Sequence, residues 1–135
     1  MNNYQGTVEV CFYGVWGSVC HNSWSQADAV VVCRQLGFSN LGQLLNKLQL
    51  NNAPIYYFMI ITTGAISHHY AYFGRRSGPI FMTNVVCSGS ETHLTNCTHS
   101  TFSSNLRSCS HIFDAGVECP GIHITLHELV WLNCC

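Results

Sequence analysis

Cysteine is the residue of this 135-residue chain best able to carry chemistry, and it occurs nine times. Cys20 and Cys33 lie thirteen positions apart and could be metal ligands, redox thiols or halves of disulfides. Structural zinc sites use close cysteine pairs, and redox thiols use C-x-x-C. Apart from Cys134-Cys135, the closest cysteine spacing is nine, between Cys11 and Cys20. The spacing therefore favours disulfides, which are typical of secreted domains.

Histidine and acidic residues give weaker signals for a reaction centre. His123 and His127 have the i, i+4 spacing of a helical metal pair, and Glu128 follows, but no further ligand lies near them. The chain has no G-x-S-x-G, H-E-x-x-H or glycine-rich phosphate motif, and its six acidic residues form no catalytic pair. We therefore expect neither an enzyme nor a metal site.

The distribution of charge excludes several classes of partner. Only 8% of the residues are charged, and no run of four basic residues occurs, which argues against nucleic acid and anionic membrane surfaces. The longest apolar stretch, residues 53–66, is shorter than the ~20 residues of a membrane span. The N-terminus does not resemble a signal peptide. We expect an extracellular fragment of a longer protein, whose leader and any membrane anchor lie elsewhere.

A few short elements must position these residues. Residues 6–20 alternate like two strands around a turn at Tyr13, and residues 79–87 and 113–119 are predicted to be later strands.

A helix is predicted over residues 26–36. Ser25 lies three residues before Asp28, which is the spacing of a capping box at a helix N-terminus. A glycine after Leu36 is a suitable stop. The expected buried stripe of this helix is Ala29, Val30, Cys33 and Leu36.

Several longer motifs occur in a fixed order: G-x-V-E-V, W-G-x-V-C, W-x-x-x-D-A-x-V-V-C-R-Q-L-G, Y-F-G-x-x-S-G-P-I, C-x-G-x-E-x-x-L-x-x-C and D-A-G-V-x-C. Together they resemble a scavenger receptor cysteine-rich (SRCR) domain. The resemblance implies an α+β fold in which a curved, disulfide-stapled antiparallel sheet cradles one helix. It places a single domain over 6–119, with 41–64 as an atypical insertion or a gene-model artefact and 120–135 as a tail of doubtful origin.

The same resemblance implies a disulfide pattern and places the chain near the six-cysteine (group A-like) subtype. Cys11 lies where the family has an apolar or aromatic residue, so we expect it to act as a small buried hydrophobe. Cys134 and Cys135 have no counterpart in the family. The implied pairs are Cys20 with Cys109, Cys33 with Cys119, and Cys87 with Cys97.

Many domains of this kind hold calcium or magnesium on an acidic cluster, and this chain departs from that pattern. His21 and Asn22 stand where the family has two aspartates, and Phe113 and Asp114 stand where it has an acidic pair. Both cations require several oxygen ligands, mostly carboxylates. We therefore expect a degenerate cation site, no cofactor, and a structural hydrogen bond between Asp114 and nearby backbone.

Exposed basic residues are the candidates for ligand contact. Arg75 and Arg76 are adjacent in a glycine-rich stretch and could bind carboxylates or sulfates, with Arg107 as a third contributor. The alternative is an ordinary solvated pair. Asn96 begins an N-x-T glycosylation sequon whose middle residue is a presumed half-cystine.

The resemblance implies an extracellular ligand-recognition module of a secreted or membrane receptor, with scavenger-receptor activity assigned by analogy. Its partner would be an extracellular protein or a polyanionic or microbial surface ligand, bound by loops of a rigid scaffold. The alternative is a structural spacer module in a larger secreted protein, such as a multidomain protease, with no ligand site of its own. The degenerate cation site favours this alternative.

Overall fold

The computed structural model describes residues 4–39, 65–101, 109–119 and 122–123. The expected insertion at 41–64 therefore lies outside the described residues, as does the tail at 120–135 except for 122–123. The described strands are β1 (Tyr4–Thr7), β2 (Glu9–Phe12), β3 (Val15–Val19), β4 (Phe38–Ser39), β5 (Ile66–His68), β6 (Ile80–Val86), β7 (Thr98–Thr101), β8 (Gly116–Cys119) and β9 (Ile122–His123). The described helices are α1 (Gln26–Gln35) and the 3₁₀ turns η1 (Leu94–Asn96) and η2 (His111–Phe113).

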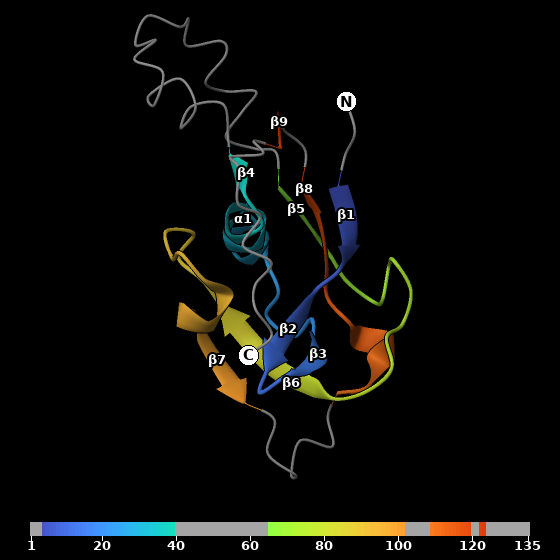
Figure 1. The fold of residues 1–135 in the computed structure, drawn as a ribbon. Helices are drawn as coiled ribbons and strands as arrows, with labels where there is room; N and C mark the ends of the chain where they lie inside the picture. The colour runs from blue at the N-terminus through green and yellow to red at the C-terminus, as the bar shows by residue number, and fades with distance from the viewer. Residues whose placement is uncertain (1–3, 40–64, 102–108, 120–121, 124–135) are drawn as a thin grey trace, which may run out of the picture.

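The strands divide between two larger sheets around one α-helix (Figure 1). One sheet has the order β1-β8-β5 and the other has the order β2-β3-β6-β7, while β4 pairs with β9. Within the described residues the expected α+β fold is confirmed. The sheet is not one antiparallel unit, however, because β3 and β6 run in parallel. Parallel neighbours need a long crossover, and here the crossover contains α1.

The predicted hairpin is present as β2 and β3. Its two turn residues, Tyr13 and Gly14, both have positive φ, at 49° and 80°. This is the backbone of a type I′ turn, whose twist suits two adjacent strands. The turn leaves the side chain of Tyr13 98% exposed.

The predicted capping box begins α1 and also links the helix to β6. The backbone N–H of Ser25 donates to Asp28 Oδ2 at 2.6 Å, as the capping-box spacing predicts. The other oxygen of the wholly buried Asp28 accepts from the backbone N–H of Cys87 at 2.7 Å. One carboxylate therefore satisfies donors from two distant segments.

The buried face of α1 differs from the predicted stripe. Val31 and Val32 are buried, whereas Val30 is half-buried and Leu36 is 47% exposed. The helix contacts β8, β5 and β4, and also η1 and β6. Because these elements contact α1 on several sides, the buried surface of the helix is wider than the narrow stripe expected of a helix that packs on one sheet.

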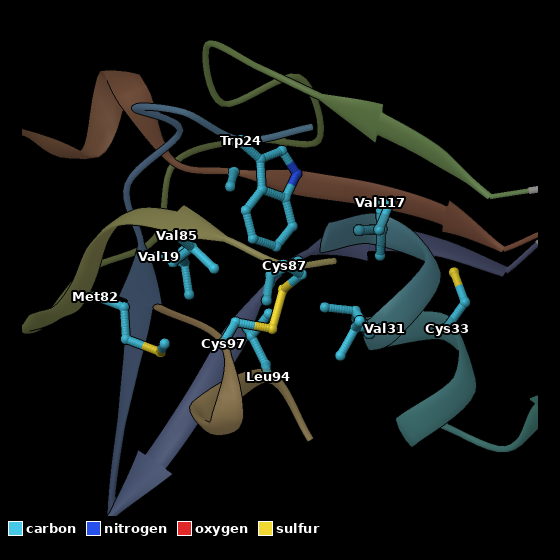
Figure 2. Close-up of a cluster of buried hydrophobic side chains, with 14 of the residues drawn as sticks. Val19, Trp24, Val31, Cys33, Met82, Val85, Cys87, Leu94, Cys97 and Val117 are labelled. Atoms are coloured by element: carbon cyan, nitrogen blue, oxygen red, sulfur yellow. A yellow bond between two sulfur atoms is a disulfide. The ribbon is translucent and has the colours of Figure 1, made fainter. Parts of the chain in front are cut away.

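The core lies between α1 and the strands that surround it (Figure 2). Trp24 fills its centre, and the indole Nε1–H donates to the carbonyl oxygen of Gly116 at 3.1 Å. This bond satisfies the only polar atom of a ring that is 4% exposed. The other members include Val19, Val31, Phe38, Met82, Val85, Leu94 and Val117.

Three disulfides among the described residues staple this small core. They are Cys20–Cys109, Cys33–Cys119 and Cys87–Cys97, the pairs that the family resemblance implies. The first two join residues 89 and 86 positions apart. Loss of such a bridge costs about 2–5 kcal/mol in a small domain.

The expected role of Cys11 is wrong. Cys11 is half of a disulfide, not a small hydrophobe that merely fills the core. It lies half-buried on β2, which is the edge strand of the four-stranded sheet. A thiol at a sheet edge is open to pairing in a way that a core thiol is not. The remaining predictions for cysteines, at Cys134 and Cys135, lie outside the described residues.

Candidate ligand-contact surface

The predicted cations Arg75 and Arg76 lie in one connection, residues 74–79, which we call the arginine loop. It leads into β6 and passes beside β1 and η2 (Figure 1). The loop starts from a closed turn, because the N–H of Gly74 donates to the carbonyl of Ala71 at 2.8 Å. From β1, the hydroxyl of Thr7 donates to the carbonyl of Gly74 at 3.0 Å.

A wholly buried carboxylate holds the middle of the arginine loop. Asp114 follows η2 and forms an isolated bridge with Cys20. Its Oδ2 accepts from the backbone N–H of Arg76 at 2.8 Å. The expected structural hydrogen bond between Asp114 and backbone is therefore present, and it positions the loop that carries the arginines.

His111 connects the same carboxylate to the end of the loop. Its Nδ1 lies 3.0 Å from both oxygens of Asp114, and its Nε2 lies 2.8 Å from the carbonyl oxygen of Gly78. A carboxylate and a carbonyl oxygen only accept hydrogen bonds, so the arrangement fits an imidazolium that donates from both nitrogens.

Electrostatics agree with this geometry. Burial lowers the pKa of His111, but hydrogen bonds to Gly78 and Asp114 and the charges of Asp114 and Glu9 raise it more. The net result is a pKa above the ordinary value of 6.5.

The two guanidinium groups of the loop are in different states. Nη2 of Arg76 lies 3.0 Å from Oε2 of Glu9 on β2, in a partly exposed ion pair. Arg75 is exposed and has no hydrogen-bond or ion-pair partner within the part of the chain that the structure describes. The third candidate, Arg107, lies outside the described residues. Arg75 is therefore the cation that the loop offers to solvent.

A groove of about 430 Å³ separates β1 from the start of the arginine loop. Gln5, Gly6, Thr7 and Glu9 line one side, and residues 73–76 line the other.

Phe73 is the aromatic wall of the groove. A Cβ built on Gly116 would lie 2.8 Å from Cδ2 of Phe73, closer than real contacts allow. The absence of a side chain at Gly116 therefore allows the ring of Phe73 to pack directly against β8.

The first half of the degenerate cation site is an aromatic cluster. The ring of His21 lies 4.5 Å from Tyr70, 5.2 Å from His69 and 5.2 Å from Phe113, measured between centroids. Its Nδ1 accepts from the backbone N–H of Tyr70 at 2.9 Å, which requires a lone pair on that nitrogen. Burial, followed by the nearby His69, lowers the pKa of His21, so the ring is neutral near pH 7.

Asp114 and Asn22 are the other predicted positions of the degenerate cation site. Asp114 holds Arg76 and His111, and Asn22 is half-buried in the turn before α1. That no cofactor binds here stays a prediction.

Potential metal ligands elsewhere are few. Among the described residues, the one group of three or more ligand-type side chains close enough for a single ion is Cys87, Glu91 and Cys97, and its two cysteines are joined as a disulfide. His123 lies on strand β9, so it is not on the helix that a helical metal pair would need. Its possible partner His127 lies outside the described residues.

The glycosylation candidate is accessible. Asn96 is the exposed last residue of η1, and the exposed Thr98 begins β7. Cys97 between them is buried and disulfide-bonded. Modification of Asn96 stays a prediction.

Several residues of this surface, His111, Glu9 and Phe73 among them, were not found by sequence reasoning. The three-residue spacing of His111 and Asp114 could have indicated an ion pair. By contrast, Glu9 and Arg76 are 67 positions apart in the sequence, and nothing local to either residue indicates their ion pair. Phe73 looks like an ordinary core residue in the sequence.

A family model described as the scavenger receptor cysteine-rich domain matches residues 1–120. This chain belongs to the SRCR domain family. It is 37% identical to galectin-3-binding protein of Rattus norvegicus in an alignment of 124 residues that covers 89% of this chain and 17% of that protein. It is 36% identical to galectin-3-binding protein of Pongo abelii, over 93% of this chain and 17% of the relative. The chain thus spans less than a fifth of these relatives' length.

Solved SRCR domains have the same fold. The SRCR domain of mouse MARCO, in a dimeric form, matches with a TM-score of 0.63 and 28% identity over 89% of this chain and 90% of that one. The third SRCR domain of murine neurotrypsin matches with a TM-score of 0.59 and 35% identity over 85% and 84%. SRCR domains are generally non-catalytic modules, and they mediate interactions with protein ligands.

Proposed function

We propose that this SRCR domain is an extracellular recognition module that binds anionic groups of a protein or surface ligand through the arginine loop. The observation that carries the proposal is Arg75, an exposed guanidinium without a described partner. It lies on a loop whose backbone is held by hydrogen bonds to other segments. Thr7 holds the start of the loop, Asp114 holds its middle and His111 holds its end. A loop fixed before binding loses less conformational entropy when a ligand arrives.

The distribution of partners among the described arginines supports an anionic ligand that is bound by a single charge-assisted contact. Among the described basic side chains, Arg34 donates to backbone carbonyls and Arg76 pairs with Glu9. Arg75 remains, and a guanidinium can bind a carboxylate or sulfate through two parallel hydrogen bonds.

The proposed location is extracellular or at a cell surface. Disulfides persist in oxidising compartments, and three of them staple the described core. Within the described residues no helix is long and apolar enough to cross a bilayer. The greater length of the relatives supports a longer parent protein that contains further modules.

A spacer module without a ligand of its own is the second candidate. The aromatic cluster around His21 favours it, because this cluster stands where many SRCR domains are expected to carry carboxylates. A spacer also needs only the stapled fold, and not the exposed Arg75.

The test is binding of the secreted, oxidised domain to immobilised heparin, with Arg75→Gln as the variant. Loss of one charge-assisted pair of 1.5–3 kcal/mol predicts roughly tenfold weaker binding or more. The matched control is His93→Gln, an exposed change at the residue before η1 that does not line the groove. Chelation of calcium should leave binding unchanged. If the unmodified domain binds neither heparin nor a ligand with a single acidic group, or if Arg75→Gln binds as well as the control, the proposal fails and the spacer module replaces it.

A further inference from the structure

The groove beside Arg75 has the net charge of a single cation. Arg76 and Glu9 form an ion pair on its wall and cancel each other, while Arg75 stays unpaired within the described residues. A site with one uncompensated cation suits a ligand with one anionic group. A long run of anionic groups would place its remaining charges against Glu9.

The polar groups of the groove both donate and accept hydrogen bonds at short spacing. The hydroxyl of Thr7 donates its hydrogen to Gly74, so toward a ligand it offers lone pairs. Glu9 has a second carboxylate oxygen besides the one that Arg76 contacts, and Gln5 presents an exposed amide. Sugar hydroxyls, which donate and accept, match such a mixed lining better than a bare carboxylate does.

Phe73 adds an apolar wall to this polar groove. Its ring is half-buried and packs edge-on against His68 and Tyr72, at centroid distances of 4.9 Å and 4.9 Å. The ring is also seated against Gly116, so it is held in place. A fixed aromatic wall suits the C–H face of a pyranose ring, since weak C–H contacts to an aromatic face recur in recognition.

The size of the groove also fits a small polar ligand. Its volume of about 430 Å³ lies within the usual range of small-molecule sites, about 300–1,000 Å³.

We infer that this groove binds the acidic terminal sugar of a glycan, a sugar that carries one carboxylate and several hydroxyls. The carboxylate pairs with Arg75, the hydroxyls meet Gln5, Thr7 and Glu9, and the ring lies along Phe73. The inference rests on the proposed function, because it takes Arg75 as the anion contact, and it names the chemical class of the ligand.

The experiment titrates the ¹⁵N-labelled oxidised domain with three probes and follows amide shifts by NMR. The probes are sialyllactose, lactose, which lacks the acidic sugar, and a short glutamate peptide, which has carboxylates without sugar. We expect sialyllactose to shift amides of residues 5–9 and 73–76 and to bind at least tenfold more tightly than lactose or the peptide. Arg75→Gln should lower its affinity about tenfold and Gln5→Ala about threefold, whereas His93→Gln should leave it unchanged.

Each other outcome overturns the inference. Equal affinity for lactose removes the role of the carboxylate, and tighter binding of the glutamate peptide makes the site one for acidic protein segments. Heparin binding without sialyllactose binding would leave the proposed function standing and remove only the acidic-sugar ligand. If no probe binds, heparin included, both proposals fail together.

Discussion

Two surface loops of this domain are each held by a charged side chain from another segment. The side chains that hold them have opposite charges. In the loop of residues 88–91, Arg34 reaches from α1 and donates to the carbonyls of Glu91 and Gly89 at 2.8 and 2.6 Å. In the arginine loop, the buried Asp114 accepts from the backbone of Arg76. The first loop is therefore held by a cation, and the second by an anion.

The difference explains which arginine is available to a ligand. Arg34 is fully used in holding another segment, so its charge serves the fold. Arg75 belongs to a loop that others hold, so its guanidinium has no structural duty among the described residues. Counting basic residues in the sequence does not separate these cases, because the decisive partners are distant carbonyls and a distant carboxylate.

Removal of Asp114 is expected to have the largest effect. Asp114→Ala leaves the backbone N–H of Arg76 and the Nδ1–H of His111 without their carboxylate acceptor, and breaking a buried pair costs about 3–5 kcal/mol. Guanidinium unfolding of the oxidised domain measures this cost. A change in the free energy of unfolding below about 1 kcal/mol would mean that Asp114 does not hold the arginine loop.

Removal of the cation that holds the other loop should have a smaller effect. Arg34→Met keeps most of the aliphatic stem but loses both hydrogen bonds, and we expect a loss of about 1–3 kcal/mol. Amide exchange should accelerate within 88–91. The matched variant Arg75→Met should change the free energy of unfolding by no more than about 0.5 kcal/mol. Equal losses for the two variants would contradict the contrast drawn between the loops.

The pH dependence of stability separates two histidines with opposite shifts. The pKa of His111 is raised in the folded state, so its contribution is fully present below the unfolded value of about 6.5 and is lost as pH rises through the folded pKa. The pKa of His21 is lowered, so its contribution is present above about 6.5 and is lost as pH falls.

Urea unfolding at pH 5.5 and pH 8.5 tests this pair. His111→Gln should destabilise the domain more at pH 5.5 than at pH 8.5, and His21→Gln should do the reverse. The same pH trend in both variants would refute the assignment of opposite charge states.

The smallest expected effect concerns the anion of residues 88–91. Hydrogen bonds from the backbone N–H groups of Ser88 and Gly89 lower the pKa of Glu91 to about 2. An NMR titration of its carboxyl carbon should show a midpoint near this value. A midpoint near 4.5 would show that these hydrogen bonds do not persist in solution.

Features set by neighbouring residues could be predicted from the sequence. The capping box of Ser25 and Asp28 acts over three positions, and the turn at Tyr13 joins two adjacent strands. The family motifs extended the prediction to disulfides 86 and 89 positions apart, which spacing alone leaves undetermined.

Features set by tertiary contacts could not be predicted in this way. Val30 was expected in the core, yet the elements around α1 bury Val31 and Val32 instead. The groove likewise forms where β1 and residue 9 meet residues 73–76, and no periodic pattern in either segment marks it. Asp114 was predicted to bond with backbone, but the sequence did not show that this backbone belongs to Arg76.

The two long-range bridges have a consequence for the covalent integrity of the domain. Cys20–Cys109 and Cys33–Cys119 both connect the segment before residue 40 to the segment after residue 100. A single proteolytic cut anywhere between Cys33 and Cys87 therefore yields two peptides that remain joined by both of these bridges. The nicked protein would migrate as one species on a non-reducing gel, and only a reducing agent would release its halves.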